Sequence, residues 1–188
     1  MAISLQVIDA MRRNAILKAA VGLALAAVFF GTALASDPAP LVPKDDAAML
    51  AAFDRAAAGL DDFLAKWRKP PAGAGSFSVK VGLVDTSTRP GYAVVRPGAS
   101  PGKFVEWFWM INLREEGAGF AAEIGNDVAY LDNVAAGQTI HFTRPDIADW
   151  MYVQGEKIVG NFTTCPALAH ASTEERHQVE EQLGIKCD

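Results

Sequence analysis

Between Lys44 and Arg68, apolar residues recur at spacings of three and four, which is the pattern of a helix with one apolar face. Two aspartates near the expected start and three basic residues near the expected end suit the helix dipole. Pro70-Pro71 would end the helix. We expect the apolar stripe to pack on a sheet, with an exposed stripe that contacts a partner as the alternative. Its members are Met49, Leu50, Phe53, Ala57, Leu60, Phe63, Leu64 and Trp67.

After a glycine-containing joint at residues 73–76, the pattern changes to that of strands. Residues 77–84 alternate with period two, which places Lys80 on the outward, polar face of a half-buried strand. Residues 85–103 are a long connection rich in Pro, Gly, Ser and Thr, with a short strand predicted at Tyr92–Val95. Residues 104–113 are apolar on both faces, which is typical of a central strand that is covered on both sides.

Turn signals divide the rest of the chain into shorter strands and one more helix. A capping box at Ser172–Glu175 begins a short polar helix that would end near Gly184. The pattern as a whole predicts an α+β fold. In it, a long N-terminal helix packs on a twisted, mostly antiparallel sheet of five to six strands, and a short C-terminal helix follows. The remaining strands are expected at residues 120–124, 138–142, 150–153 and 157–162.

The N-terminus has the three parts of an export signal. Three basic residues precede a short apolar region at 19–30, and Ala33-Leu34-Ala35 supplies a small-x-small cleavage site. The apolar stretch is shorter than the roughly 20 residues that span a bilayer, so the pattern favours cleavage after Ala35 over an uncleaved anchor. We therefore expect a periplasmic or secreted protein without a stable membrane anchor. The expected segments are a signal peptide at 1–35 (with Met11 as an alternative start), a linker at 36–43 and one domain at 44–188.

Charge narrows the classes of partner. The whole chain carries a formal net charge of −5, and removal of residues 1–35 takes away three basic residues and one acidic residue, which leaves −7. Nucleic acids are bound by clustered Lys and Arg, and this acidic sequence contains no such cluster. We expect no nucleic-acid partner and no cofactor. The expected partner is a protein or a small-molecule ligand.

Cys165 and Cys187 both lie in the expected mature chain, and an even pair in a small exported protein predicts a disulfide. The bond would close a loop of about 22 residues, and the loop-entropy treatment puts its contribution at roughly 3 kcal/mol. The alternative is a metal pair with His170 or His177. Because neither cysteine belongs to a Cys-x-x-Cys or comparable ligand cluster, the sequence favours the disulfide and predicts no metal site.

Five short pieces of sequence, in this order, resemble the YegJ-like family, which is catalogued as domain of unknown function 2314. The resemblance covers about residues 75–164. It implies a small α+β domain that is often exported, and it carries no established activity. The helix at 44–68 and the cysteine-bearing tail lie outside it. The pieces are Glu106-x-x-Trp109, Gly125-Asn126-Asp127, Val134-Ala-Ala-Gly137, Ile147-Ala-Asp-Trp-Met-Tyr152 and Gly160-Asn-Phe-Thr-Thr164.

Two carboxylates are candidates for acid–base chemistry. Glu106 lies in the aromatic strand, where desolvation can raise the pKa of a carboxyl group. Asp149 precedes Trp150 and could pair with Glu106 or Asp146, as acid–base hydrolases require. The structural alternatives are an edge-strand glutamate paired with a basic residue, and an aspartate that accepts backbone N–H groups at a turn. The sequence favours the structural alternatives.

Three tryptophans are candidates for binding. If the face that bears Trp107 and Trp109 is uncovered, it forms an aromatic platform for an apolar or sugar-like ligand or for a protein partner; Trp150 is a third candidate. If the helix covers that face, these side chains are ordinary core. His141 is expected to be exposed, and Thr163-Thr164 to be ordinary strand sequence.

The favoured function is therefore a non-catalytic ligand-binding or protein-interaction module in the periplasm. The alternative is a hydrolase-like enzyme that uses a pair formed by Glu106 and Asp149.

Overall fold

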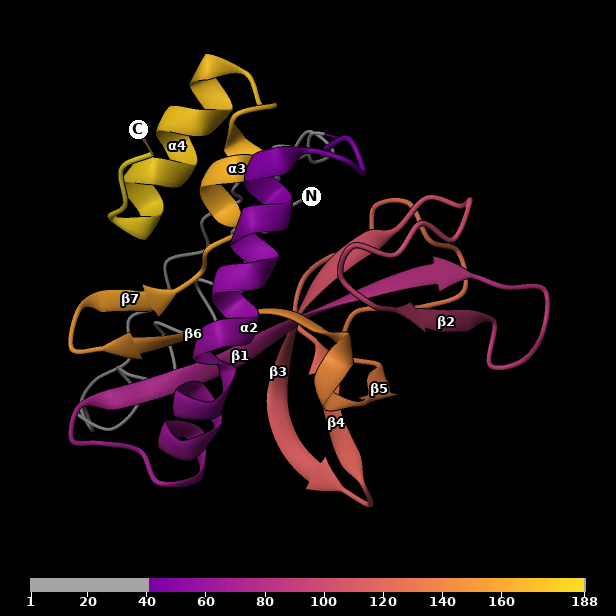
Figure 1. Cartoon of the computed structure of the whole chain (residues 1–188), viewed down its shortest axis with the longest axis horizontal. Helices are drawn as coiled ribbons and strands as arrows, with labels where there is room; N and C mark the ends of the chain where they lie inside the picture. The colour runs from indigo at the N-terminus through magenta and orange to yellow at the C-terminus, as the bar shows by residue number, and fades with distance from the viewer. Residues whose placement is uncertain (1–40, 188) are drawn as a thin grey trace, which may run out of the picture.

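The computed structural model describes residues 41–187, so the expected signal peptide lies outside the described residues. Helix α2 (Ala47–Arg68) begins close to the expected position, because the side chain of Asp46 caps it by accepting the Met49 backbone N–H at 2.7 Å. It ends just ahead of Pro70-Pro71. Figure 1 shows α2 lying across the sheet.

Within residues 41–187, seven strands form one sheet in which every pairing is antiparallel. The strand order is β5-β4-β3-β1-β6-β7, and β2 also pairs with β1. The expected α+β class is confirmed, although the sheet has seven strands instead of five or six because the short β2 joins it. The strands are β1 (Ala74–Asp85), β2 (Tyr92–Val95), β3 (Glu106–Glu116), β4 (Gly119–Ile124), β5 (Thr139–Phe142), β6 (Ile147–Gln154) and β7 (Lys157–Gly160).

One face of the sheet forms the main core with α2. Val79 and Val81 of β1 lie opposite Met110 and Phe108 of β3, and all four side chains are fully buried in this cluster. The buried residues of α2 are not quite the expected stripe, since Leu50 is 37% exposed and Ala57 is also exposed, whereas Ala52 and Ala56 are buried. The buried helix residues are Met49, Ala52, Ala56, Leu60, Phe63 and Leu64.

Trp150 joins α2 to this core. Its Nε1 donates a hydrogen bond to the Ala56 carbonyl at 2.8 Å, and its ring stacks on Phe63 at a centroid distance of 5.2 Å. A Cβ at Gly59 would lie 2.6 Å from the Trp150 ring, so only glycine lets the helix approach this closely. Trp150 is therefore a core residue.

The opposite face of β1 is also buried, which corrects the expectation of a half-buried strand. Lys80 was expected to point outward, but it is 1% exposed and lies opposite Trp109 of β3 and Asp149 of β6. Ser78 on the same face is equally buried. The sheet is thus covered on both sides along its central strand.

The chain ends in two helices, α3 (Thr164–Leu168) and α4 (Thr173–Leu183). Helix α3 lies beside the N-terminal part of α2 (Figure 1). Thr163-Thr164, expected in a strand, instead form the start of α3. The predicted disulfide is confirmed, with an S–S distance of 2.05 Å between Cys165 and Cys187. In the described part of the chain, no helix is both long enough and apolar enough to cross a membrane.

Candidate functional site

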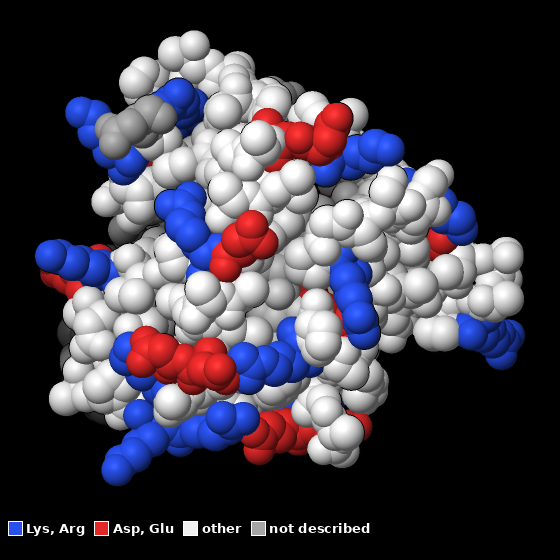
Figure 2. Space-filling model, viewed as in Figure 1, with Lys and Arg blue, Asp and Glu red and all other residues white. Residues whose placement is uncertain are grey.

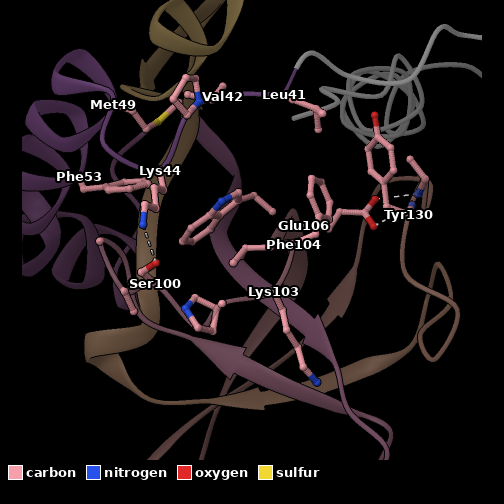
Figure 3. A pocket seen from close by; sticks show the side chains of 18 residues that line it. Leu41, Val42, Lys44, Met49, Phe53, Ser100, Lys103, Phe104, Glu106 and Tyr130 are labelled. Atoms are coloured by element: carbon pink, nitrogen blue, oxygen red, sulfur yellow. Dashed lines mark hydrogen bonds between the residues drawn. The ribbon is translucent and has the colours of Figure 1, made fainter.

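A pocket of about 400 Å³ opens near the N-terminal end of α2 (Figure 3). Three stretches that are distant in sequence line it. The first is residues 41–44 with Met49 and Phe53 of α2, the second is the loop 98–105 with the start of β3, and the third is residues 129–130. Figure 3 shows Met49 and Phe53 on one side and Phe104 and Tyr130 on the other. Because loops build most of its wall, the pocket is not visible as a local sequence motif.

Aromatic side chains dominate this pocket. The rings of Phe53 and Trp107 lie 5.3 Å apart between centroids, and those of Phe104 and Tyr130 lie 4.7 Å apart. Trp107 is half-buried and rests on Gly82, where an added Cβ would lie 2.8 Å from the ring. Of the three tryptophans singled out above, Trp107 is thus the one that faces a pocket.

The exposed apolar side chains of the described chain gather around the same pocket. Four large hydrophobic residues are more than a third exposed: Leu41 at 62%, Phe104 at 44%, Tyr130 at 38% and Leu50 at 37%. The first three line the pocket. Leu50 lies against the pocket loop, because its Cδ2 is 3.9 Å from where a Cβ would stand at Gly98. Large exposed apolar patches are typical of interaction sites, so this pocket is the candidate site.

Glu106 lies at the base of the pocket and its carboxylate is engaged by the backbone. Oε1 accepts the Ala129 N–H at 2.7 Å, and Oε2 accepts the N–H groups of Tyr130 and Leu131, each at 3.0 Å. The side chain is 7% exposed. Glu106 therefore fixes the loop that carries Tyr130, which is a positioning role.

Asp149 forms a second buried network on the other side of the sheet. Its Oδ1 accepts the Trp150 N–H at 2.8 Å, and its Oδ2 accepts both the N–H and the hydroxyl of Thr163 at 2.8 and 2.7 Å. Lys80 donates to the Thr163 hydroxyl at 2.6 Å, and its ammonium lies 4.3 Å from the centroid of the Trp109 ring.

Burial dominates the protonation behaviour of this network. It lowers the pKa of Lys80 to about 8, against the opposing attraction of Asp149. It also raises the pKa of Asp149, against the opposing effects of Lys80 and of the hydrogen bonds from Thr163 and Trp150. Burial therefore disfavours the charged forms of both Lys80 and Asp149, whereas the attraction between the ammonium and the carboxylate favours them.

The register of the sheet separates Glu106 from Asp149. Glu106 lies opposite Leu83 of β1, on the face that packs against α2, whereas Asp149 lies opposite Lys80. Positions 80 and 83 of one strand point to opposite faces because side chains alternate. The structure therefore does not bring the two carboxylates together. Trp109, at 1% exposure, and Trp150, at 5%, are core residues.

The histidines and cysteines offer no metal centre in the described residues, where no group of three or more His, Cys, Asp or Glu side chains could hold an ion. His141 is exposed, as expected, and its Nε2 lies 2.9 Å from Glu116. His170 pairs with Asp46 at 3.0 Å. Both cysteines are used in the disulfide.

Sequence reasoning missed two sets of residues. The pocket residues Leu41, Phe53, Phe104 and Tyr130 come from separate segments, and only their three-dimensional arrangement makes them a site. The sequence pattern predicts a surface position for Lys80 and a strand position for Thr163, and both are buried in one network. The signal that could have found Lys80 is its place opposite the doubly apolar strand 104–113, since a strand paired with a covered strand is itself often covered.

Comparison with known proteins confirms the family seen in the sequence and corrects its extent, since the match includes the helix and the cysteine-bearing tail that were expected to lie outside it. The family DUF2314, described as "Uncharacterized protein conserved in bacteria", matches residues 46–187. The chain is also similar to the uncharacterized protein YegJ of Escherichia coli (strain K12), with 34% identity over 92 residues. This alignment covers 49% of the present chain and 60% of the E. coli protein. No solved structure matches. The family match includes α2, the pocket from Met49 onward and both cysteines. The chain therefore belongs to the DUF2314 family of bacterial proteins.

Proposed function

We propose that this domain is a non-catalytic binding module of an exported protein, and that the pocket beside Trp107 binds a small ligand with an apolar body. The observation that carries the proposal is the gathering of exposed Leu41, Leu50, Phe104 and Tyr130 around one pocket. A volume of about 400 Å³ lies within the range of about 300–1,000 Å³ for small-molecule sites. A ligand that covers exposed apolar surface is favoured by about 25 cal/mol for each Å² that it removes from water.

Two parts of the pocket wall are held in place by the fold. Glu106 fixes residues 129–131 through three hydrogen bonds, and Phe53 belongs to the long helix α2. A wall that is already ordered costs little entropy on binding. This arrangement suits a binding site whose shape is set by the fold.

The geometry gives no support to the hydrolase alternative. Glu106 and Asp149 lie on opposite faces of the sheet, and each carboxylate accepts three hydrogen bonds from the chain. A pair that acts on one substrate must flank a single site at about 5–10 Å. Both carboxylates have structural roles that explain their burial.

Export is supported by the sequence of residues 1–35 and by the disulfide, which suits an oxidising compartment. The test is an intact mass spectrum of the protein after expression in a bacterium with its own leader. We expect the mass of Ser36–Asp188 less two hydrogens in the periplasmic fraction. The full-length mass, or a mass with two free thiols, would contradict the export proposal.

Binding is tested with the neutral fluorescent probe N-phenyl-1-naphthylamine. We expect its fluorescence to rise when it enters the wild-type pocket, and the rise to weaken strongly in Phe104→Ala and Trp107→Ala. Ile158→Ala on β7 is the matched control, because it removes a half-buried apolar side chain outside the pocket. Equal loss in the control, or no fluorescence rise in the wild type, would contradict the pocket proposal.

A further inference from the structure

We infer that the ligand of this pocket is an apolar molecule that carries a carboxylate and binds as a single dissolved molecule, and that Lys44 binds its carboxylate. The inference rests on the proposed binding function and adds the chemical class of the ligand. It depends on the charges that line the pocket, which differ from those of the rest of the protein. The whole chain is acidic, with a net charge of −5, yet the pocket is lined by two lysines and one glutamate.

The single acidic residue of the lining is not available to attract a cation. Both oxygens of Glu106 are engaged by the N–H groups of residues 129–131, at 2.7 to 3.0 Å. Figure 3 shows these bonds running from the carboxylate toward the segment that carries Tyr130. A carboxylate that accepts three backbone donors has its charge stabilised within the protein. The lining therefore presents an excess of positive charge to a ligand.

Lys44 and Lys103 differ in the hydrogen bonds that their ammonium groups already form. The Lys103 ammonium donates to the Asp85 carbonyl at 2.8 Å, and Figure 3 shows it directed away from the aromatic side chains. Lys44 donates to the Ser100 hydroxyl at 3.4 Å, which is at the long limit for a hydrogen bond. An ammonium has three donor hydrogens, so Lys44 can bind a ligand carboxylate while it keeps its link to Ser100.

Within the described residues, Lys44 forms no ion pair with a carboxylate. On the face shown in Figure 2, many basic side chains lie beside acidic ones. Elsewhere in this chain, Lys66 pairs with Asp62 and Arg144 with Asp61. Lys44 instead has a neutral hydroxyl as its neighbour at the mouth of an aromatic pocket. An apolar body against Phe53 and Trp107, with a negative group at Lys44, would satisfy both features.

The size of the pocket limits the ligand. At about 30 Å³ for each non-hydrogen atom, the share of a water molecule in the liquid, a volume of about 400 Å³ holds on the order of a dozen such atoms, and a larger molecule such as the dye would extend from the open side of the pocket. This is the size of a medium-chain fatty acid or of a small aromatic acid. We therefore choose probes with a ten-carbon chain that differ in the head group.

The experiment measures how decanoate, decanol and decyltrimethylammonium displace N-phenyl-1-naphthylamine, each below the concentration at which it forms micelles. Decanoate is expected to bind about 2–5-fold more tightly than decanol, the value of an exposed ion pair, and the cationic probe least tightly. The preference for decanoate is expected to shrink as salt is added. In Lys44→Met it is expected to disappear while decanol binding stays the same.

Lys157→Met is the matched control, because Lys157 is an exposed lysine at the start of β7 and does not line the pocket. It should leave the order of the three probes unchanged. Equal displacement by decanol and decanoate, or a preference that survives in Lys44→Met, would overturn the carboxylate inference and leave the apolar pocket intact. If no probe displaces N-phenyl-1-naphthylamine, or the dye fails to bind, the pocket proposal itself is wrong. A concentration-dependent dimer in sedimentation would then assign this surface to a second copy of the chain.

Discussion

Glu106 and Asp149 are both buried carboxylates in strands, and each accepts three hydrogen bonds, yet they serve different regions of the molecule. Glu106 holds a loop at the base of an open pocket and accepts only backbone N–H groups. Asp149 lies in a closed network with Lys80 and Thr163, where its hydrogen-bond partners include a side-chain hydroxyl. The Glu106 carboxylate therefore fixes a loop of the pocket, and the Asp149 carboxylate belongs to a sealed interior network.

The two regions are also reinforced differently. The network around Asp149 borders α3, which begins next to Thr163 and carries one cysteine of the disulfide. The pocket region has exposed aromatic residues and a loop, 96–105, that contains two prolines and two glycines. Under the proposed function, the region of Asp149 serves stability and the region of Glu106 serves binding. Substitutions near Asp149 should then mainly lower the free energy of unfolding, and substitutions near Glu106 should weaken binding.

Asp149→Ala is expected to lower the free energy of unfolding by about 3–5 kcal/mol, because it leaves Lys80 as a buried charge without its acidic neighbour. Urea denaturation of the folded protein measures this loss. The double variant Lys80→Met/Asp149→Ala should lose less than Asp149→Ala alone, since it removes the charge as well as its partner. Additive losses would show that the two residues are not coupled.

Removal of the disulfide in Cys165→Ser/Cys187→Ser is expected to lower the free energy of unfolding by about 3 kcal/mol. The bond joins residues that are 22 positions apart, and its loss frees α4 from α3. Because the pocket lies outside the loop that the bond closes, the affinity for N-phenyl-1-naphthylamine should stay unchanged. A large loss of affinity would show that the two regions are coupled.

Stability is expected to depend on pH through Lys80. In the folded chain its pKa is about 8, whereas 10.5 is the ordinary value. Below pH 8 the amine is charged in both states, so the cost of burying the charge is fully present. Between pH 8 and 10.5 the unfolded chain binds more protons, so this group makes the folded chain more stable as pH rises. From pH 7 to 10 the gain should be on the order of 2 kcal/mol.

The measurement is urea denaturation at several pH values on the wild type and on Lys80→Met/Asp149→Asn. The double variant removes both titrating groups of the network, so the difference between the two proteins isolates them. The wild type should gain stability relative to the variant as pH rises from 8 to 10. Parallel pH profiles would contradict the lowered pKa of Lys80.

Glu106→Gln is expected to give the smallest loss of stability, about 1–2 kcal/mol, because the amide keeps one acceptor oxygen for the three N–H groups. Hydrogen exchange of the amides of residues 129–131 should become faster, and the pocket should bind N-phenyl-1-naphthylamine more weakly. Asp85→Asn is the control, because Asp85 accepts the N–H groups of Asp132 and Asn133 through longer, exposed contacts of 3.3 and 3.4 Å. Unchanged exchange in Glu106→Gln would show that the carboxylate does not order the loop.

The elements that the sequence predicted are those with a strong local pattern. The period of α2, the alternation of β1 and the apolar strand β3 each encode their own structure, and the disulfide followed from a single cysteine pair. The burial of Lys80 could not be predicted in the same way. The pattern Ser-x-Lys-x-Gly in β1 predicts a polar face in contact with solvent. Only the structure shows that Asp149 of β6 and Thr163 at the start of α3 cover this face and interact with Lys80.

The candidate site was predictable only in part. Trp107 was singled out as an aromatic residue that could face a ligand, and it does line the pocket. Trp109 and Trp150 have equally aromatic surroundings in sequence, and only the register and the position of α2 show that they are core. Phe104, Tyr130 and Lys44 come together through loop conformations that no periodic pattern encodes.

The most direct test of the account is a ¹H–¹⁵N spectrum of the tryptophan indoles during titration with N-phenyl-1-naphthylamine. The chain has four tryptophans, and of these Trp107 alone lines the pocket. We predict that the Trp107 indole signal, assigned by its loss in Trp107→Phe, shifts strongly while those of Trp109 and Trp150 remain in place. Shifts at Trp109 or Trp150 without one at Trp107, or no shift at any indole, would contradict the claim that this pocket is the binding site.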